Sequence, residues 1–459
     1  MNDRLEWVEG WGGAVGGAGY VFKPTDPGGV ADALNAARAE GAPVALRGAG
    51  CSYGDAAYRA ESVVLDLSRL SRILEWNPET GAVDVEPGVS LAALWRMGIG
   101  DGWWPPVVTG TMEPTIGGML AMNVHGQNHW KGGTLGEHCT EFDIVLANGE
   151  SQTISRRKDA ELFHDVIGSF GQLGIITRAQ LSMKRVHSGM VEVKAVSAPD
   201  LEAMLSLMDD AKDKWEYVVG WIDAFAGGRN LGRGLLHFAR HLDDGEDDDP
   251  AASLDASAQD LPGNLFGVVP KSLMWRFLKP FTNRPGMRCI NLAKYVMGST
   301  IGDEKEYRQT LGAFSFLFDY VPDWKNVYHP GGFIQHQSFV PTASAEQVFR
   351  DQLELCREHG RPAFLAVLKR HRPDPFLLSH SVDGFSLALD FPVVPGRREE
   401  LWEMVRSLAE PVAAVGGRFY PAKDAALPGE LYRSTFRDGQ LDRFASLKKK
   451  LDPDRRRDC

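Results

Sequence analysis

The chain lacks the features that would mark it as a disulfide-stabilised or membrane-spanning protein. It has few cysteines, an odd and widely spaced set without a CxxC pair: Cys51, Cys139, Cys289, Cys356 and Cys459. Such spacing argues against a disulfide framework and favours a reducing compartment. No stretch approaches the ~20 apolar residues of a transmembrane helix, and the opening residues MNDRLEWVEGWGG form no apolar leader. We therefore expect a cytoplasmic protein without a transmembrane segment.

Positive charge is scarce as well. Lys and Arg number 50 against 61 Asp and Glu, for a formal net charge of -11. This balance argues against nucleic-acid binding, which needs basic surfaces to neutralise phosphates. Much of the acidity lies in residues 243–249, which we interpret as part of a mobile, solvated loop at 243–262 rather than a metal site. His129, Glu137 and His138 also lack the spacing of a metal motif, so we expect no metal.

The length of 459 residues suggests two or three domains. Residues 1–190 alternate helix-like and strand-like segments without the regular βαβ order of a Rossmann domain. From about residue 190 the pattern of apolar and polar residues changes. Longer strand-like runs then predominate, at 217–222, 234–238, 333–340, 364–369 and 385–391. Helical patterns follow at 345–359 and 399–415, and the whole predicts an α+β fold.

Glycine is abundant in three short segments. The first, Arg47-Gly48-Ala49-Gly50-Cys51-Ser52-Tyr53-Gly54, follows a predicted buried strand. Small residues in such a turn let backbone N–H groups surround an anion such as a pyrophosphate. Taken alone the signal is weak, because the spacing is not GxGxxG and no βαβ unit follows.

The second segment, residues 109–136, places seven glycines beside hydroxyl, amide and imidazole groups, and the third spans Gly168–Ile176. An irregular glycine-rich loop is the alternative interpretation. The recurrence of such segments favours a cradle for a phosphate-bearing cofactor.

These segments resemble a known family. RGAGCSYGD, PVVTGTMEPTIGGMLAMNVHGQNHWKGGTLGEH and GSFGQLGIIT are similar to the FAD-binding segments of vanillyl-alcohol-oxidase-type (PCMH-type) flavoproteins. FDYVPDWKNVYHPGGFIQHQSFVP, FLAVLKR, FSLALDFPV and GGRFYPAKD resemble the decaprenylphosphoryl-β-D-ribose oxidase family within that group. The resemblance implies a two-part FAD-binding domain, residues 1–190 completed by 411–459, with an inserted α+β substrate domain at 191–410.

The resemblance also implies roles for single residues. The cofactor would contact Arg47, Gly48, Ala49, Gly50, Cys51, Ser52, Tyr53, Gly110, Thr115, Ile116, Gly117, Gly118, Met122, Asn123, His125, Gly174, Ile176 and Tyr420. The substrate would contact Tyr53, Gln335, Gln337, Lys369 and Lys423. His125 and Lys423 are the catalytic candidates, since oxidising an alcohol requires a base for the hydroxyl proton. Lys423 has a second interpretation, a fixed charge favouring reduced flavin.

Two positions depart from the family pattern. Relatives with covalent flavin carry a histidine in the first glycine turn where this chain has Cys51, so we expect non-covalent FAD. A thiolate at Cys51 is the alternative, although a small buried thiol is the simpler interpretation. Ala388 replaces a cysteine of the mycobacterial-type enzymes, which predicts that inhibitors trapping that thiol will not bond covalently here.

The expected function is FAD-dependent oxidation of a secondary hydroxyl of a pentose or related sugar, with polyprenyl-phosphate-linked pentoses among the candidates. This would be the 2'-oxidation step of an epimerisation completed by a reductase partner. Two alternatives stay open: an alditol or aldonolactone oxidase using oxygen, and a flavin-binding partner subunit without turnover. The basic, apolar stretch at Lys271–Arg288 allows either a core element or a peripheral membrane contact.

Overall fold

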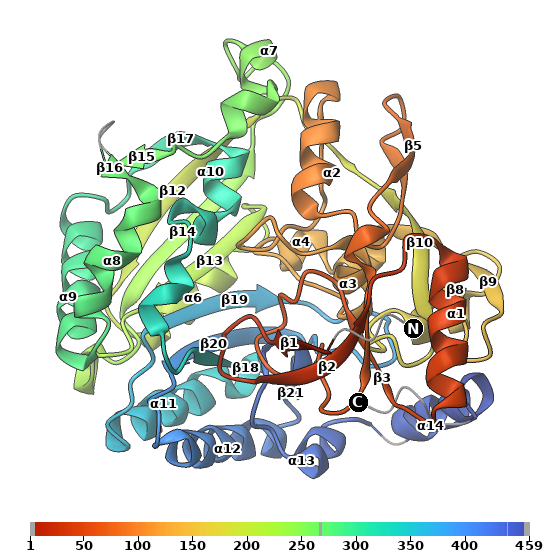
Figure 1. Cartoon of the computed structure of the whole chain (residues 1–459). Coiled ribbons are helices and arrows are strands. Elements are labelled where there is room, and N and C mark those ends of the chain that lie inside the picture. Colours follow the sequence, from red (N-terminus) through yellow and green to blue (C-terminus); the bar gives the residue numbers. More distant parts are fainter. Residues whose placement is uncertain (1–4, 266–268, 438, 454–459) are drawn as a thin grey trace.

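The computed structural model describes residues 5–265, 269–437 and 439–453, and Figure 1 shows a mixed fold of helices around several sheets. A four-stranded sheet has the order β1 (Leu5–Glu9), β2 (Gly16–Phe22), β4 (Val63–Asp66), β3 (Val44–Arg47). A five-stranded sheet has the order β5 (Ile73–Asn77), β6 (Ala82–Val85), β10 (Ile175–Ser182), β8 (Cys139–Val145), β9 (Ser151–Ser155). The α+β character expected from the sequence is confirmed at this level.

The largest sheet has eight strands. Their order is β17 (Glu306–Thr310), β12 (Met190–Ala198), β14 (Gly234–His241), β13 (Tyr217–Ile222), β19 (Leu365–His371), β20 (Gly384–Pro392), β18 (Phe333–Pro341), β21 (Arg418–Phe419). Two short pairs complete the strands: β7 (Trp103–Trp104) with β11 (Lys184–Arg185), and β15 (Asn264–Leu265) with β16 (Val269–Pro270).

The helices are distributed along the whole chain. The first half holds α1 (Pro27–Ala39), α2 (Leu91–Gly98), α3 (Ile116–Ala121), α4 (His129–Gly132), α5 (Ala160–Val166) and α6 (Leu201–Ala211). The second half holds α7 (Pro250–Ser253), α8 (Met274–Leu278), α9 (Arg284–Thr300), α10 (Leu311–Ser315), α11 (Thr342–Glu358), α12 (Arg398–Ala414), α13 (Gly429–Ser434) and α14 (Gln440–Leu451). Among the described residues, no helix is long and apolar enough to cross a membrane.

The eight-stranded sheet has one apolar and one partly polar face, because side chains alternate along a strand. On β18, Ile334 and Val340 belong to the core shared with α6, α11 and α12, and Figure 1 shows α11 and α12 along the lower side of this sheet. Gln335 and Gln337 occupy the intervening positions, and both line a cavity on the opposite face. Gln335 and Gln337 therefore lie on the face that the helices leave uncovered, whereas Ser338 on the covered face donates a hydrogen bond to Gln352 of α11.

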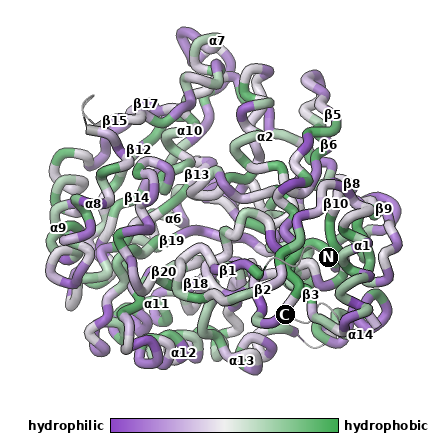
Figure 2. Tube along the Cα trace, viewed as in Figure 1, coloured by the Kyte–Doolittle hydropathy of each residue, from purple (hydrophilic) through white to green (hydrophobic). Residues whose placement is uncertain are grey.

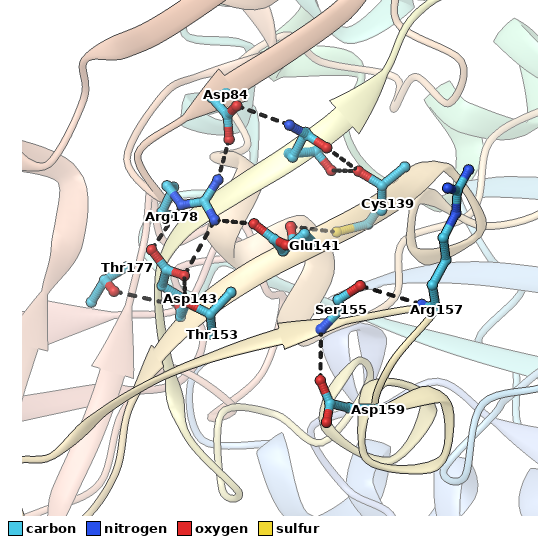
Figure 3. Close-up of polar contacts among 12 residues, drawn as sticks. Asp84, Cys139, Glu141, Asp143, Thr153, Ser155, Arg157, Asp159, Thr177 and Arg178 are labelled. Carbon is cyan, nitrogen blue, oxygen red and sulfur yellow. Dashed lines mark hydrogen bonds and ion pairs between the residues drawn. The ribbon is translucent and has the colours of Figure 1, made fainter.

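A charged cluster on the five-stranded sheet ties three strands together. Arg178 of β10 pairs with Asp143 of β8 at 2.7 Å between Nε and Oδ2, and with Asp84 of β6. Its guanidinium also contacts Glu141 of β8 at 2.5 Å, as Figure 3 shows. The hydrogen bond to Asp143 is the largest of several contacts that raise the pKa of Arg178 above its ordinary range. One planar donor thus fixes the relative position of β6, β10 and β8.

The acidic segment at 243–262 differs from the mobile loop that we expected. Glu246 pairs with Arg240 at 2.6 Å, and Asp247 accepts a hydrogen bond from Ser253 at 2.6 Å. Asp249 caps α7 by accepting from the backbone N–H of Ala252 at 3.1 Å. Part of the acidic run therefore stabilises local structure, which composition alone does not reveal.

The C-terminal helix α14 contacts the first half of the chain. Arg443 of α14 pairs with Asp165 at 2.6 Å, and Lys448 donates to Gln172 at 2.8 Å. These contacts are compatible with the expected completion of the first domain by residues 411–459, although the domain boundaries themselves stay a prediction. Cys459 lies outside the described residues, and the other cysteines are free thiols.

Candidate active site

A cavity of about 440 Å³ lies between the glycine segments and the polar face of the eight-stranded sheet. Its volume is within the usual range for small-molecule and cofactor sites. It brings together most of the site residues predicted from the sequence: Arg47, Gly48, Ala49, Gly50, Cys51, Ser52, Tyr53, Gly110, Thr115, Gly117, Gly118, Met122, His125, Gly174, Ile176, Gln335, Gln337, Lys369, Tyr420 and Lys423.

Two predicted cofactor contacts lie elsewhere. Ile116 is fully buried in the apolar core beside the cavity. Asn123 has a φ of 46°, and its Oδ1 accepts a hydrogen bond from the N–H of Gly136 at 3.1 Å. Neither residue lines the cavity. Asn123 instead holds the loop that carries His125, a role invisible in the sequence.

Sequence reasoning missed several lining residues. Trp11 comes from a loop that gave no signal, and Phe170 lies in the third glycine segment but was not itself predicted to line the site. Val219 and Trp221 share one face of β13, and Lys294 comes from α9. The apolar run YVVGWI predicts a buried strand, and the two-residue period of a strand places Val219 and Trp221 on one face of it. It does not reveal that this face meets a cavity, because that depends on strand order in the sheet.

The first glycine turn fits a phosphate-bearing cofactor. A Cβ added at Gly48 would lie 2.2 Å from Oγ1 of Thr115, so only glycine is accommodated. In the described part of the chain, that buried hydroxyl has no hydrogen-bond partner. The backbone N–H groups of Ala49 to Ser52 likewise make no hydrogen bond to any described residue. Unsatisfied donors beside a cavity are what a bound phosphate requires.

Titratable and aromatic groups meet at one end of the cavity. Nζ of Lys423 lies 3.7 Å from the ring centroid of Tyr53. On the facing strands, Gln335 donates a hydrogen bond to Asp390. Burial lowers the pKa of Lys423 well below its ordinary value of 10.5. The negative charge of Asp390 raises this pKa in part, and the positive charge of Lys369 lowers it further. Burial likewise raises the pKa of Asp390 and lowers that of Lys369 to about 8.

His125 lies in a buried group of histidines. Its Nδ1 is 3.1 Å from Nε2 of His380, and its Nε2 is 3.2 Å from Nε2 of Gln337. The amide nitrogen of Gln337 can only donate, so Nε2 of His125 accepts and Nδ1 carries the proton. Burial, followed by the charge of Lys369, lowers the pKa of His125 well below its ordinary range. At neutral pH the ring is therefore uncharged and both nitrogens are engaged.

Cys51 faces the cavity as a thiol. Burial, assisted by the charge of Glu113, raises its pKa to about 12. At neutral pH the reactive thiolate is therefore a very small fraction.

We expect Gly48→Ala to weaken cofactor retention, because the added methyl collides with Thr115 at the phosphate cradle. The ratio of flavin to protein absorbance after purification should fall at least about tenfold relative to the unchanged protein. Gly100→Ala is the matched control, since a Cβ there meets nothing within 4 Å. Equal flavin content in both variants would contradict the assignment of this turn.

Comparison with known proteins agrees with this geometry. A family model described as FAD binding domain matches residues 18–155, which include the first two glycine segments. A decaprenylphosphoryl-beta-D-ribose oxidase of Mycolicibacterium smegmatis is 29% identical over 454 residues, covering 97% of this chain and 94% of that protein. An uncharacterised protein of Streptomyces coelicolor is 26% identical over 373 residues, covering 80% of this chain and 96% of that one.

A more distant similarity covers part of the chain. Cytokinin dehydrogenase 2 of Oryza sativa subsp. japonica is 28% identical over 235 residues, or 48% of this chain and 41% of that protein. The chain thus carries a PCMH-type FAD-binding domain and is an FAD-binding oxidoreductase.

Proposed function

We propose that this enzyme oxidises a secondary hydroxyl of a pentose or related sugar carried on a polyprenyl phosphate. The similarity over 97% of the chain to a decaprenylphosphoryl-beta-D-ribose oxidase supports the substrate class. The observation that carries the proposal is the convergence of Lys423, Gln335, Gln337 and Lys369 on one cavity wall. Several polar groups at fixed positions suit a polyol, whose hydroxyls each need a partner.

Lys423 is the better of the two candidate bases. Bound FAD would supply the hydride acceptor for the alcohol carbon. The hydroxyl proton must leave to a base of this chain, and burial gives Lys423 a neutral amine fraction near neutral pH. Nζ of Lys423 would accept that proton, while Asp390 stabilises the resulting ammonium.

The neighbouring side chains would hold the sugar. Gln335 can donate its second amide N–H to a sugar hydroxyl and accept at Oε1. Gln337 donates both of its amide N–H groups to His125 and Ser386, so only its Oε1 can accept from a sugar hydroxyl. His125 has both nitrogens engaged by Gln337 and His380, so we assign it to positioning Gln337 rather than to proton transfer. Lys369 adds positive charge beside both His125 and Lys423.

The product of this step is a ketone. An epimerisation would therefore require a reductase partner that returns a hydride from the opposite face. We propose such a partner, and peripheral contact with the membrane that holds the lipid-linked sugar.

The most direct test of the proposed function is anaerobic bleaching of the flavin absorbance by a panel of substrates. We expect polyprenyl-phosphoryl pentoses to bleach the flavin, and free alditols and aldonolactones to do so far more slowly. Rapid bleaching by an alditol or lactone alone, with peroxide formed in air, would indicate the oxygen-using oxidase instead. A protein that retains flavin and is bleached by none of these compounds would indicate a subunit without turnover.

Variants at Lys423 separate a base from a fixed charge. The neutral amine is the active form of a base, so the bleaching rate should rise with pH through the lowered pKa of Lys423. Lys423→Arg keeps the charge but cannot release its proton, and should slow bleaching about 100-fold or more.

Lys158→Arg, at an exposed position, is the control and should leave the rate unchanged. A fast Lys423→Arg variant, or a flat pH profile, would assign Lys423 to charge stabilisation instead. Flavin content measured in parallel distinguishes lost chemistry from lost cofactor.

We further propose that FAD is held without a covalent bond, since the raised pKa of Cys51 leaves little thiolate to attack the flavin. Trichloroacetic acid should therefore release the yellow colour into the supernatant. Colour retained in the pellet of the unchanged protein, but lost from Cys51→Ala, would show a thioether at this position.

A further inference from the structure

Exposed apolar side chains concentrate on one surface. In the described part of the chain, nine of the fifteen exposed large hydrophobic residues fall between residues 273 and 301: Leu273, Phe277, Leu278, Phe281, Ile290, Leu292, Val296, Met297 and Ile301. They belong to α8, α9 and the residues that join and flank these helices, and Figure 2 shows hydrophobic residues recurring along both. We call residues 273–301 the α8–α9 surface. Such a concentration on a folded protein indicates an interaction site.

The charge of the same segment is opposite in sign to that of the whole protein. Residues 261–302 contain six Lys and Arg and no Asp or Glu, in a chain of net charge -11. Arg276, Lys279, Arg284 and Arg288 are exposed. None of the four pairs with a carboxylate of any described residue. The surface therefore combines apolar groups with available cations.

The inner side of the same helix reaches the active-site cavity. Lys294 of α9 lines the cavity, and its Nζ lies 4.3 Å from the ring centroid of Trp221. Asn291 is buried, and α9 packs on β12 and β14 at the far end of the eight-stranded sheet. One helix thus forms both a wall of the cavity and most of the α8–α9 surface.

We propose that the α8–α9 surface binds an anionic phospholipid bilayer peripherally. Its apolar side chains would enter the interfacial region, and its arginines would pair with lipid phosphates. A second copy of the chain fits less well, because it would place like charges against each other. This inference names the surface for the peripheral contact proposed above, and membrane binding itself does not require turnover.

Vesicle sedimentation tests the proposal with the flavin-loaded, full-length protein. Phosphatidylcholine vesicles containing phosphatidylglycerol should bind the protein, and pure phosphatidylcholine vesicles should bind it less. Phe277→Ser with Met297→Ser removes two side chains that are 66% and 62% exposed, and should lower binding about tenfold or more. Arg276→Gln with Arg288→Gln should abolish the preference for anionic lipid and the sensitivity to salt.

Leu5→Ser with Leu74→Ser is the matched control, since these side chains are 61% and 46% exposed away from this surface. It should bind vesicles as the unchanged protein does. Undiminished binding by Phe277→Ser with Met297→Ser would overturn the proposal, as would loss of a dimer in that variant without lipid. Vesicle binding without flavin bleaching would leave the surface assignment standing and reject only the proposed reaction.

Discussion

The close contact between the first glycine turn and the segment before α13 is the constraint on which the site depends. A Cβ at Gly54 would lie 1.7 Å from the carbonyl oxygen of Asp424, and the N–H of Tyr53 donates to Ala422 at 2.8 Å. Residues near positions 50 and 420 are thereby held at one place. The same contact puts Nζ of Lys423 against the Tyr53 ring. The base proposed for the reaction is therefore positioned by the same glycine turn that we propose to hold part of the cofactor.

Burial gives the polar groups of this cavity their chemistry. Removing an ammonium group from water disfavours its charged form, so the pKa values of Lys423 and Lys369 fall. The same effect keeps His125 neutral and Cys51 protonated. A lowered pKa leaves part of the lysine as neutral amine near neutral pH, so that it can accept a proton, whereas it makes a histidine too weakly basic to accept one. In this buried cavity lysine is therefore the better proton acceptor, whereas in water near neutral pH histidine would be.

The position of α9 relates the cavity to the protein surface. The helix is apolar and basic outside, and it presents Lys294 to the cavity inside. A lipid-linked substrate has two parts that differ in the same way, an apolar chain and a polar sugar phosphate. A helix between the bilayer and the sheet would therefore place the sugar near the polar wall without moving the lipid chain far from the membrane.

The sequence by itself determined the local elements and the kind of cofactor. The strand-like runs at 217–222 and 333–340 predicted β13 and β18, and the two-residue period of a strand places Gln335 and Gln337 on one face. These features depend on neighbouring residues, so a pattern along the chain suffices. The glycine segments, through their resemblance to a flavoprotein family, indicated FAD.

Only the tertiary structure decided what depends on contacts between distant residues. It placed Ile116 in the core and gave Asn123 a backbone role, and it brought Lys294 and Trp221 to the cavity. It also distinguished His125 from Lys423, because a pKa shift depends on burial and on charges that the fold brings together. A sequence records which groups can titrate, and only the packed chain determines how much water and which charges surround each one.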